Sequence, residues 1–203
     1  MVTRRGMTRS AILEASVDLF GSRGFSAVSL DDIAGVVGVA KQTVLYWFPS
    51  KDELLDAVLE QTALELAAVI EAAVRAAPDE PLARIEAVIK AVLRPAVRRP
   101  ALLGLVREVS RLSPDHAARL TDQVRPFVRR ATDYLGEEMA NGRLRMADPG
   151  LVVALAYATV TGIATEPTAL QAVEWQATTT GLRRLRRELT EFLLAALRPQ
   201  NPH

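Results

Sequence analysis

Apolar residues recur at every third or fourth position along almost the whole chain, and this spacing is what most limits its possible folds. It places the apolar side chains on one face of an α-helix. The alternation of apolar and polar residues that marks a half-buried strand is almost absent, and Ala, Leu, Arg and Glu dominate. The sequence therefore predicts an all-α protein with about nine helices.

Capping residues, glycines and prolines divide the chain into these helices. Thr8, Ser29 and Ser50 are predicted N-caps, and Pro49 ends the helix that precedes it. The final helix contains a weak point at Gly181. The predicted helices span residues 8–22, 30–37, 40–48, 51–76, 81–97, 101–112, 115–140, 149–164 and 170–197.

The composition excludes several classes of function. The chain has no cysteine, which rules out disulfides, thiol catalysis and thiolate metal sites. It has only two histidines, His116 and His203, and no nucleophile–base pair stands out, so we expect no catalytic residue, metal or cofactor. The longest apolar stretch, residues 151–165, is short for a bilayer, and the first residues lack the apolar region of a signal peptide. The sequence predicts a cytoplasmic protein that is not an enzyme.

Two short predicted helices, 30–37 and 40–48, stand on either side of a turn at Gly38. This is the arrangement of a helix-turn-helix, whose second helix can lie in the major groove of DNA. Three aromatic residues in a row end the second helix, and one helix cannot bury three consecutive side chains against one partner. We therefore expect Phe48 to face the core and Tyr46 to face outward.

The rest of the second helix follows the same division. Ala40 and Val44 share the inward face with Phe48, while Gln42 points outward. Gln can read adenine through two hydrogen bonds, and Thr43 beside it can contact a phosphate or a thymine methyl group. The outward face therefore carries groups that can read DNA.

The segment from Ser29 to Leu55, SLDDIAGVVGVAKQTVLYWFPSKDELL, resembles the N-terminal DNA-binding segment of the TetR family of bacterial transcriptional regulators. The matching features are Ser29, Ile33-Ala34, Gly38-Val39, Thr43, Phe48, Ser50-Lys51 and Leu54. The resemblance implies a three-helix DNA-binding domain over residues 6–66, with its motif at 29–48. It also implies a helical effector-binding and dimerisation domain over residues 67–203.

The resemblance also implies which residues contact DNA. They are Ser29, Lys41, Gln42, Thr43, Leu45, Tyr46, Trp47 and Lys51. Three positions depart from the family's pattern: Leu45 and Trp47 replace the usual tyrosine and histidine, and Asp31 stands where a basic or polar residue is common. Arginines at 4, 5 and 9 form either a solubilising tail or an arm that reaches phosphates.

Two apolar stripes near the C-terminus are candidates for a dimer interface, in which two helices from each subunit would form a four-helix bundle. The alternative is that the stripes pack within the monomer. Candidate interface residues are Leu151, Leu155, Thr159, Leu182, Leu185, Leu189 and Phe192. An effector pocket is expected in the middle helices, where each candidate can also be plain core. The candidates are Leu102, Leu105, Val106, Val109, Phe127, Tyr134, Tyr157 and Trp175.

These features and the resemblance together predict a sequence-specific transcriptional regulator. We expect a repressor that binds a palindromic double-stranded DNA operator as a homodimer, away from membranes. A small, mainly apolar effector would release it, because the candidate pocket residues are mostly apolar. The alternative is a helical protein-interaction module that has lost DNA binding.

Overall fold

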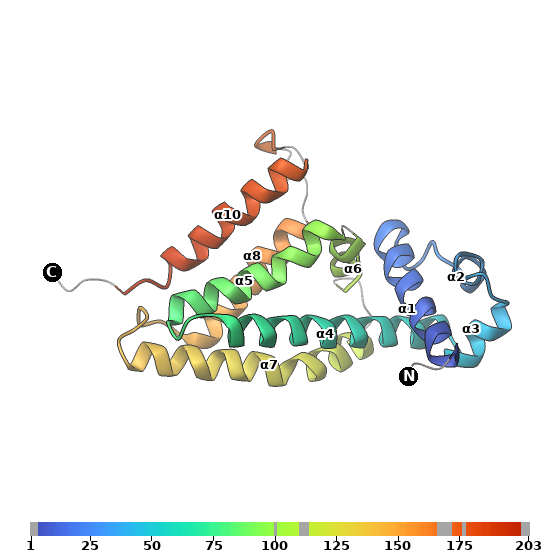
Figure 1. Cartoon of the computed structure of the whole chain (residues 1–203), viewed down its shortest axis with the longest axis horizontal. Coiled ribbons are helices and arrows are strands. Elements are labelled where there is room, and N and C mark those ends of the chain that lie inside the picture. The colour runs from blue at the N-terminus through green and yellow to red at the C-terminus, as the bar shows by residue number, and fades with distance from the viewer. Residues whose placement is uncertain (1–3, 100, 110–113, 166–171, 176–177, 200–203) are drawn as a thin grey trace. The chain divides into compact units, whose positions relative to one another are not determined.

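The computed structural model describes residues 4–99, 101–109, 114–165, 172–175 and 178–199, and each regular element within these ranges is α-helical (Figure 1). The all-α prediction is confirmed. The helices are α1 (Arg4–Arg23), α2 (Leu30–Val37), α3 (Lys41–Trp47), α4 (Lys51–Ala76), α5 (Pro81–Arg98), α6 (Ala101–Val109), α7 (Pro114–Ala140), α8 (Pro149–Thr165) and α10 (Thr179–Ala195).

Two predicted boundaries are wrong. Helix α1 begins at Arg4, so Thr8 lies inside the helix and is not its N-cap. The only helix breaker upstream is Gly6, and an interior glycine costs a helix only about 1 kcal/mol. The last helix begins at Thr179 rather than at residue 170, because Thr178 caps it by accepting a 3.0 Å hydrogen bond from Gly181 N.

Contacts divide the chain into two compact units. Unit 1 comprises Met1–Leu64 and Arg99–Gln123, and unit 2 comprises Glu65–Arg98 and Val124–His203. Unit 1 thus contains the middle segment Arg99–Gln123, which the predicted division between residues 66 and 67 assigns to the second domain. The helix-turn-helix segment lies wholly in unit 1.

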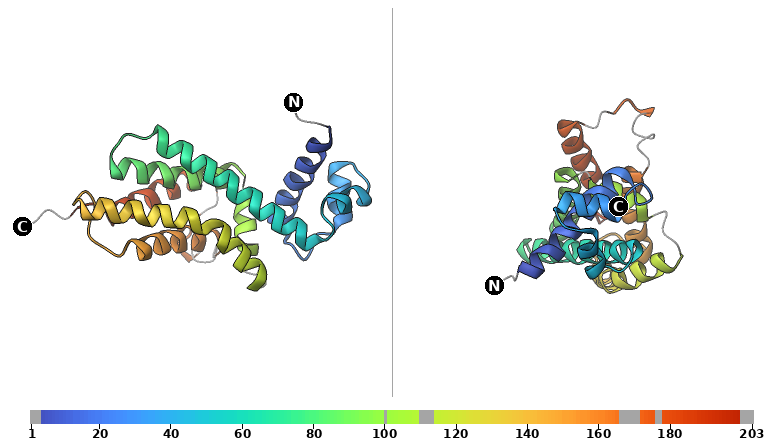
Figure 2. Two further views of the ribbon diagram at one scale, coloured as in Figure 1. Left: turned by 90° about the horizontal axis from the view of Figure 1, so that it is seen from below. Right: turned by 90° about the vertical axis from the view of Figure 1, so that its right-hand side faces the viewer.

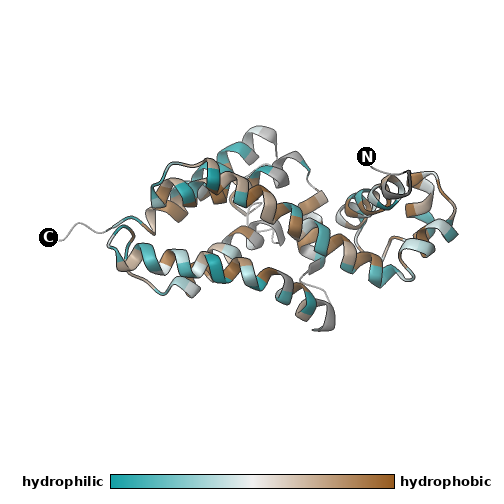
Figure 3. Cartoon of the chain, turned by 60° about the horizontal axis from the view of Figure 1, so that its bottom comes forward, coloured by the Kyte–Doolittle hydropathy of each residue, from teal (hydrophilic) through white to brown (hydrophobic). Residues whose placement is uncertain are grey.

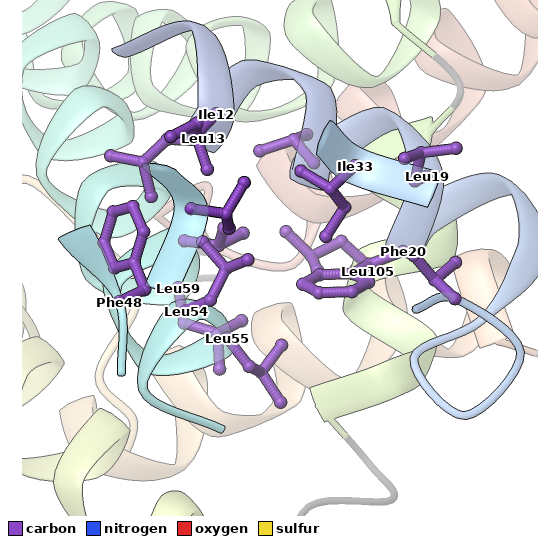
Figure 4. Close-up of a cluster of buried hydrophobic side chains, with 14 of the residues drawn as sticks. Ile12, Leu13, Leu19, Phe20, Ile33, Phe48, Leu54, Leu55, Leu59 and Leu105 are labelled. Carbon is purple, nitrogen blue, oxygen red and sulfur yellow. The ribbon is translucent and has the colours of Figure 1, made fainter. Parts of the chain in front are cut away.

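One continuous apolar core holds unit 1 together. Figure 4 shows side chains from α1, α2, α4 and α6 pointing toward one another in this core. Burying each large apolar side chain stabilises the fold by roughly 1.5–3 kcal/mol. The buried members are Ile12, Leu13, Val17, Leu19, Phe20, Val28, Ile33, Ala34, Val44, Phe48, Leu54, Leu55, Val58, Leu59 and Leu105.

Helices α1 and α6 touch backbone to backbone within unit 1. A Cβ atom added to Gly104 would lie 1.7 Å from the carbonyl oxygen of Gly21, and one added to Gly21 would lie 1.9 Å from that of Ala101. No other residue fits such an approach, because every other side chain begins with a Cβ. The two glycines therefore set how close α6 lies to α1.

Polar contacts tie both ends of α6 to the same unit. The Arg99 guanidinium pairs with the carboxylates of Glu14 at 2.9 Å and Asp18 at 2.7 Å. The hydrogen bond to Asp18 is the main cause that raises the pKa of Arg99. At the other end, Glu108 Oε2 accepts a 2.8 Å hydrogen bond from Phe25 N, in the connection between α1 and α2.

Unit 2 is built around a second, smaller core. Its buried apolar members are Leu135, Met139, Leu144 and Leu197, and α5 packs against α10. Figure 2 shows the turn that joins α7 to α8 and reverses the direction of the chain. Gly142 adopts a φ of 70° in this turn, and the buried Glu138 carboxylate pairs with Arg143 Nε at 2.6 Å.

Most helices carry both hydrophobic and hydrophilic residues, as Figure 3 shows. Helix α8 is the exception, because its sequence carries no charged residue. Even so, among the helices that the structure describes, none combines the length and the apolar character needed to cross a bilayer.

We expect Gly104→Ala to lower the free energy of unfolding by at least about 2 kcal/mol, because overpacking against a rigid backbone forces the helices apart. Chemical denaturation of the whole chain, followed by circular dichroism, measures this change. Gly35→Ala in α2 is the matched control, since a Cβ there meets nothing within 4 Å. The control should be neutral or slightly stabilising. Equal stability of the two variants would contradict the close contact.

Candidate nucleic-acid interface

The start of α2 is fixed by a reciprocal capping box. Ser29 Oγ accepts a 3.1 Å hydrogen bond from Asp32 N, and the Asp32 carboxylate accepts one of 2.8 Å from Ser29 N. The Ser29 hydroxyl also donates to this carboxylate. These bonds hold the pKa of Asp32 below its ordinary value. They satisfy backbone donors that the first turn of a helix otherwise leaves open.

The turn between α2 and α3 depends on a left-handed glycine. Gly38 has a φ of 75° and ψ of 34°, and its N–H donates to Ala34 O. Val39 N donates to the same oxygen at 3.0 Å. A residue with a Cβ would be strained in this conformation, so Gly38 is the residue that ends α2 and redirects the chain into α3.

Helix α3 presents the predicted faces. Val44 is fully buried and Phe48, just past its end, is 4% exposed, whereas Tyr46 is 63% exposed. Gln42 is also exposed. The predicted faces are confirmed for Val44, Phe48, Gln42 and Tyr46. The placement of Ala40 on the inward face is wrong, because Ala40 is the N-cap residue before α3 and is exposed. Trp47 is half-buried against the core and meets the Tyr46 ring edge-on, with 5.4 Å between the ring centroids.

An open hollow of about 380 Å³ lies along this outward side. Gln42, Thr43, Tyr46 and Trp47 from α3 line it, together with Thr8 from α1. Thr8 was not among the predicted contact residues, and no sequence signal could have added it, because its place depends on how α1 packs against α3. The hollow brings the predicted reading residues together on one surface.

Both lysines of the motif already have partners. Lys41 Nζ lies 2.7 Å from Asp31 Oδ2, and both side chains are at least half exposed. Lys51 Nζ donates to the carbonyl oxygens of Phe25 and Val28, both at 2.9 Å, and lies 4.3 Å from the centroid of the Phe25 ring. Lys51 therefore holds the connection between α1 and α2, and one of its three N–H groups remains for another acceptor.

The remaining predicted contact residues differ in what they can offer. The single hydroxyl proton of Ser29 goes to Asp32, so a phosphate contact from this hydroxyl requires that proton to change partner. Leu45 is half-buried and has no polar group. The DNA contacts of all eight predicted residues stay predictions.

The candidate pocket residues are divided between the two units. Leu102, Leu105, Val106 and Val109 belong to unit 1, and Phe127, Tyr134, Tyr157 and Trp175 belong to unit 2. Leu105 is 3% exposed and packs within the core of unit 1, and its assignment to a pocket stays a prediction. Leu102 packs against the same core, and the side chain of Val109 lies outside the described part of the chain.

In unit 2, desolvation by burial raises the pKa of Tyr134, although a hydrogen bond from Arg84 opposes the shift. Phe127 is half-buried beneath the Arg130 guanidinium, which lies 4.9 Å from its ring centroid. Tyr157 is 62% exposed, so it lines no enclosed space in a single chain. Among the described residues, no group of three or more acidic or histidine side chains could hold a metal ion.

The candidate interface residues fall into two groups. Leu151, Leu155 and Phe192 are 61%, 65% and 65% exposed, so three large apolar side chains of α8 and α10 stay uncovered in the single chain. Leu189 is only 6% exposed, and a buried side chain offers nothing to a partner subunit, so its assignment to the interface is wrong. Thr159 and Leu185 are half-buried, and the side chain of Leu182 lies outside the described residues.

The capped α2, the left-handed turn and the outward polar face of α3 define a helix-turn-helix protein. Residues 12–58 match the family described as bacterial regulatory proteins, tetR family. The chain is 47% identical over 53 residues to the HTH-type transcriptional regulator RutR of Escherichia coli K12, a match that covers 26% of this chain and 25% of that protein. It thus spans about a quarter of the length of this curated relative.

Solved structures extend the likeness to the whole fold. A transcriptional regulator of the TetR/AcrR family from Thermobifida fusca aligns with a TM-score of 0.65 and 27% identity, over 92% of this chain and 96% of that one. The fatty acid degradation regulator FadR from Bacillus halodurans aligns with a TM-score of 0.78 over 93% of this chain and 99% of that one, and its 17% identity shows the fold alone. Residues 12–58 thus resemble the DNA-binding segment of the TetR family, and the alignment with the Thermobifida fusca regulator carries the likeness beyond that segment.

We expect Ser29→Ala to lower the thermal midpoint at neutral pH, because the variant loses the N-cap of α2. Loss of such a cap typically costs about 1 kcal/mol of stability. The lowered pKa of Asp32 adds a pH dependence. A lowered carboxyl pKa stabilises the fold above the unfolded pKa, and this stabilisation is lost as the pH falls through the folded pKa.

In thermal melts of both proteins at decreasing pH, the difference between their midpoints should therefore shrink as the pH falls through the lowered pKa of Asp32. The part of the difference due to the hydrogen bond from Asp32 N to Ser29 Oγ should remain. Thr178→Ala, which removes the cap of α10, is the matched control without an acidic partner at the third helical position. A Ser29→Ala difference that stays constant as the pH falls would contradict the link to Asp32.

Proposed function

We propose that the protein is a DNA-binding transcriptional regulator that reads a specific duplex with α3. The observation that carries this proposal is the outward face of α3, where Gln42, Thr43 and Tyr46 border one open hollow while Val44 is buried beneath them. Gln and Thr side chains provide both donors and acceptors for base edges and phosphates. The similar proteins are themselves described as transcriptional regulators, which also argues against an enzyme.

The proposed regulator acts as a homodimer on a palindromic operator. A single short recognition helix contacts few base pairs, so such proteins bind paired half-sites through two-fold symmetry. The exposed Leu151, Leu155 and Phe192 supply an apolar surface that a second copy would cover. A bound dimer would block access to the promoter, which makes repression the proposed output.

The proposed signal is a small, mainly apolar effector that binds in the helical C-terminal part and lowers DNA affinity. A ligand can act in this way only if it binds better to the conformation that does not fit DNA. The similar fold in Bacillus halodurans is described as a regulator of fatty acid degradation, so long-chain acyl compounds are the first effectors to test.

A protein-interaction module that has lost DNA binding is the second candidate. The segment from Ser29 to Lys51 contains two acidic residues, Asp31 and Asp32, and two basic ones, Lys41 and Lys51. Its formal charge is therefore balanced, and both lysines have protein partners. Because the attraction of phosphates depends on free positive charge, this balance favours the second candidate.

Selection of duplexes from a random library by the purified protein, at two salt concentrations, separates the two candidates. We expect an enriched palindrome whose binding weakens steeply as salt rises. Absence of any enriched sequence at low salt would refute the regulator and support the interaction module.

With the selected duplex in hand, we expect Gln42→Ala to lower specific affinity by about 1–3 kcal/mol per half-site, because the variant loses a base-reading side chain. Affinity for an unrelated duplex of equal length should hardly change. Gln61→Ala on α4 makes the same replacement outside the motif and serves as the control. An equal loss for both duplexes would mean that Gln42 does not read bases.

We expect Leu155→Glu to weaken dimerisation at least tenfold, since a two-fold interface contains each substitution twice and buries the new charges. Sedimentation equilibrium measures the dissociation constant. Leu64→Glu replaces another exposed leucine, 58% exposed on α4, and should leave the constant unchanged. An unaltered constant in Leu155→Glu would place the interface elsewhere.

A further inference from the structure

The ion pair between Asp31 and Lys41 has no evident role in holding the fold together. It joins the first turn of α2 to the first residue of α3, and both side chains are largely exposed, at 64% and 50%. Pairs exposed to this degree contribute little to stability, typically 0–1 kcal/mol. The N-terminal cap of α2 does not need Asp31 either, because Asp32 forms the capping box with Ser29.

The pair does change the charge that α3 offers to DNA. Lys41 opens α3, beside the outward residues Gln42 and Thr43. The other lysine of the motif, Lys51, already donates to two backbone carbonyls. With the Asp31 carboxylate 2.7 Å from its ammonium group, Lys41 attracts a phosphate less than an unpaired lysine does.

We propose that Asp31 restrains the DNA affinity of this surface by holding Lys41, and that it is therefore a positioning residue for DNA recognition. This inference rests on the proposed function, since it concerns the same DNA-reading face. A phosphate must compete with the Asp31 carboxylate for the Lys41 ammonium group. Binding that depends only on phosphates is thus weakened, and base contacts from Gln42 and its neighbours carry a larger share of the affinity.

The expected consequence is a trade of affinity for selectivity. Non-specific binding to DNA comes almost entirely from phosphate contacts and counterion release. Removing the carboxylate frees one cation per subunit for any duplex, whatever its sequence. Asp31→Asn should therefore raise affinity for a random-sequence duplex about 2- to 5-fold per subunit near 0.1 M salt, and steepen the salt slope by about 1 per subunit.

A double-mutant cycle tests the proposal. Wild type, Asp31→Asn, Lys41→Gln and the double variant are titrated with a random-sequence duplex over a range of salt, with folding checked by thermal melts. In the Lys41→Gln background, Asp31→Asn frees no ammonium group, so the change in affinity should be under about twofold and the slope unchanged. Asp133→Asn, on an exposed residue of α7 in unit 2, controls for the change in net charge.

The outcomes separate this inference from the proposed function. The inference is supported if Asp31→Asn binds more tightly than wild type while the double variant binds no more tightly than Lys41→Gln. It is also supported if Asp31→Asn is the one protein of the four that binds. Equal tightening in both backgrounds would mean that Asp31 only repels phosphates, and no tightening would mean that it exerts no restraint. Either result overturns the inference while DNA binding stands. If none of the four proteins binds any duplex at low salt, the proposed function itself fails, and the inference fails with it.

Discussion

The burial of Val44 and Phe48 is the constraint on which the candidate interface depends. Helix α3 has only seven residues, and an isolated helix of that length is not stable in water. Its N-cap position, Ala40, provides no side-chain hydrogen bond. The helix therefore exists because Val44 and Phe48 anchor it to the core of unit 1. The same two contacts fix its rotation, which turns Gln42 and Tyr46 toward solvent.

That core is completed by a segment from the middle of the chain. Leu105 of α6 lies among the side chains that also bury Phe20, and the Gly21–Gly104 approach lets α6 come within backbone contact of α1. Glu108 then bonds to the connection between α1 and α2, where Lys51 also donates. The proposed DNA-reading surface and α6 thus belong to one packed unit. Any rearrangement of α6 acts on the connection that leads into the helix-turn-helix.

The formal charge of the segment from Ser29 to Lys51 is balanced rather than strongly basic. Asp31 pairs with Lys41, and the backbone carbonyls of Phe25 and Val28 engage Lys51. Base contacts and shape therefore have to contribute much of the proposed affinity, because less phosphate attraction is available. The departures at Leu45 and Trp47 fit this picture, since neither an aliphatic side chain nor a half-buried indole adds charge.

Local sequence determined much of this protein. The apolar spacing specified helices, Ser29 with Asp32 specified the start of α2, and Gly38 specified the turn, because each of these choices depends on residues within a few positions. The outward position of Tyr46 followed from the helical period alone.

Only the tertiary structure decided which distant residues meet. Gly21 and Gly104 touch, Asp31 reaches Lys41, and Leu189 is buried while Phe192 on the same helix stays exposed. Each of these depends on how whole helices pack, and no short-range pattern encodes the distance or rotation between two helices. For that reason the faces of single helices could be predicted, and the partners of those faces could not.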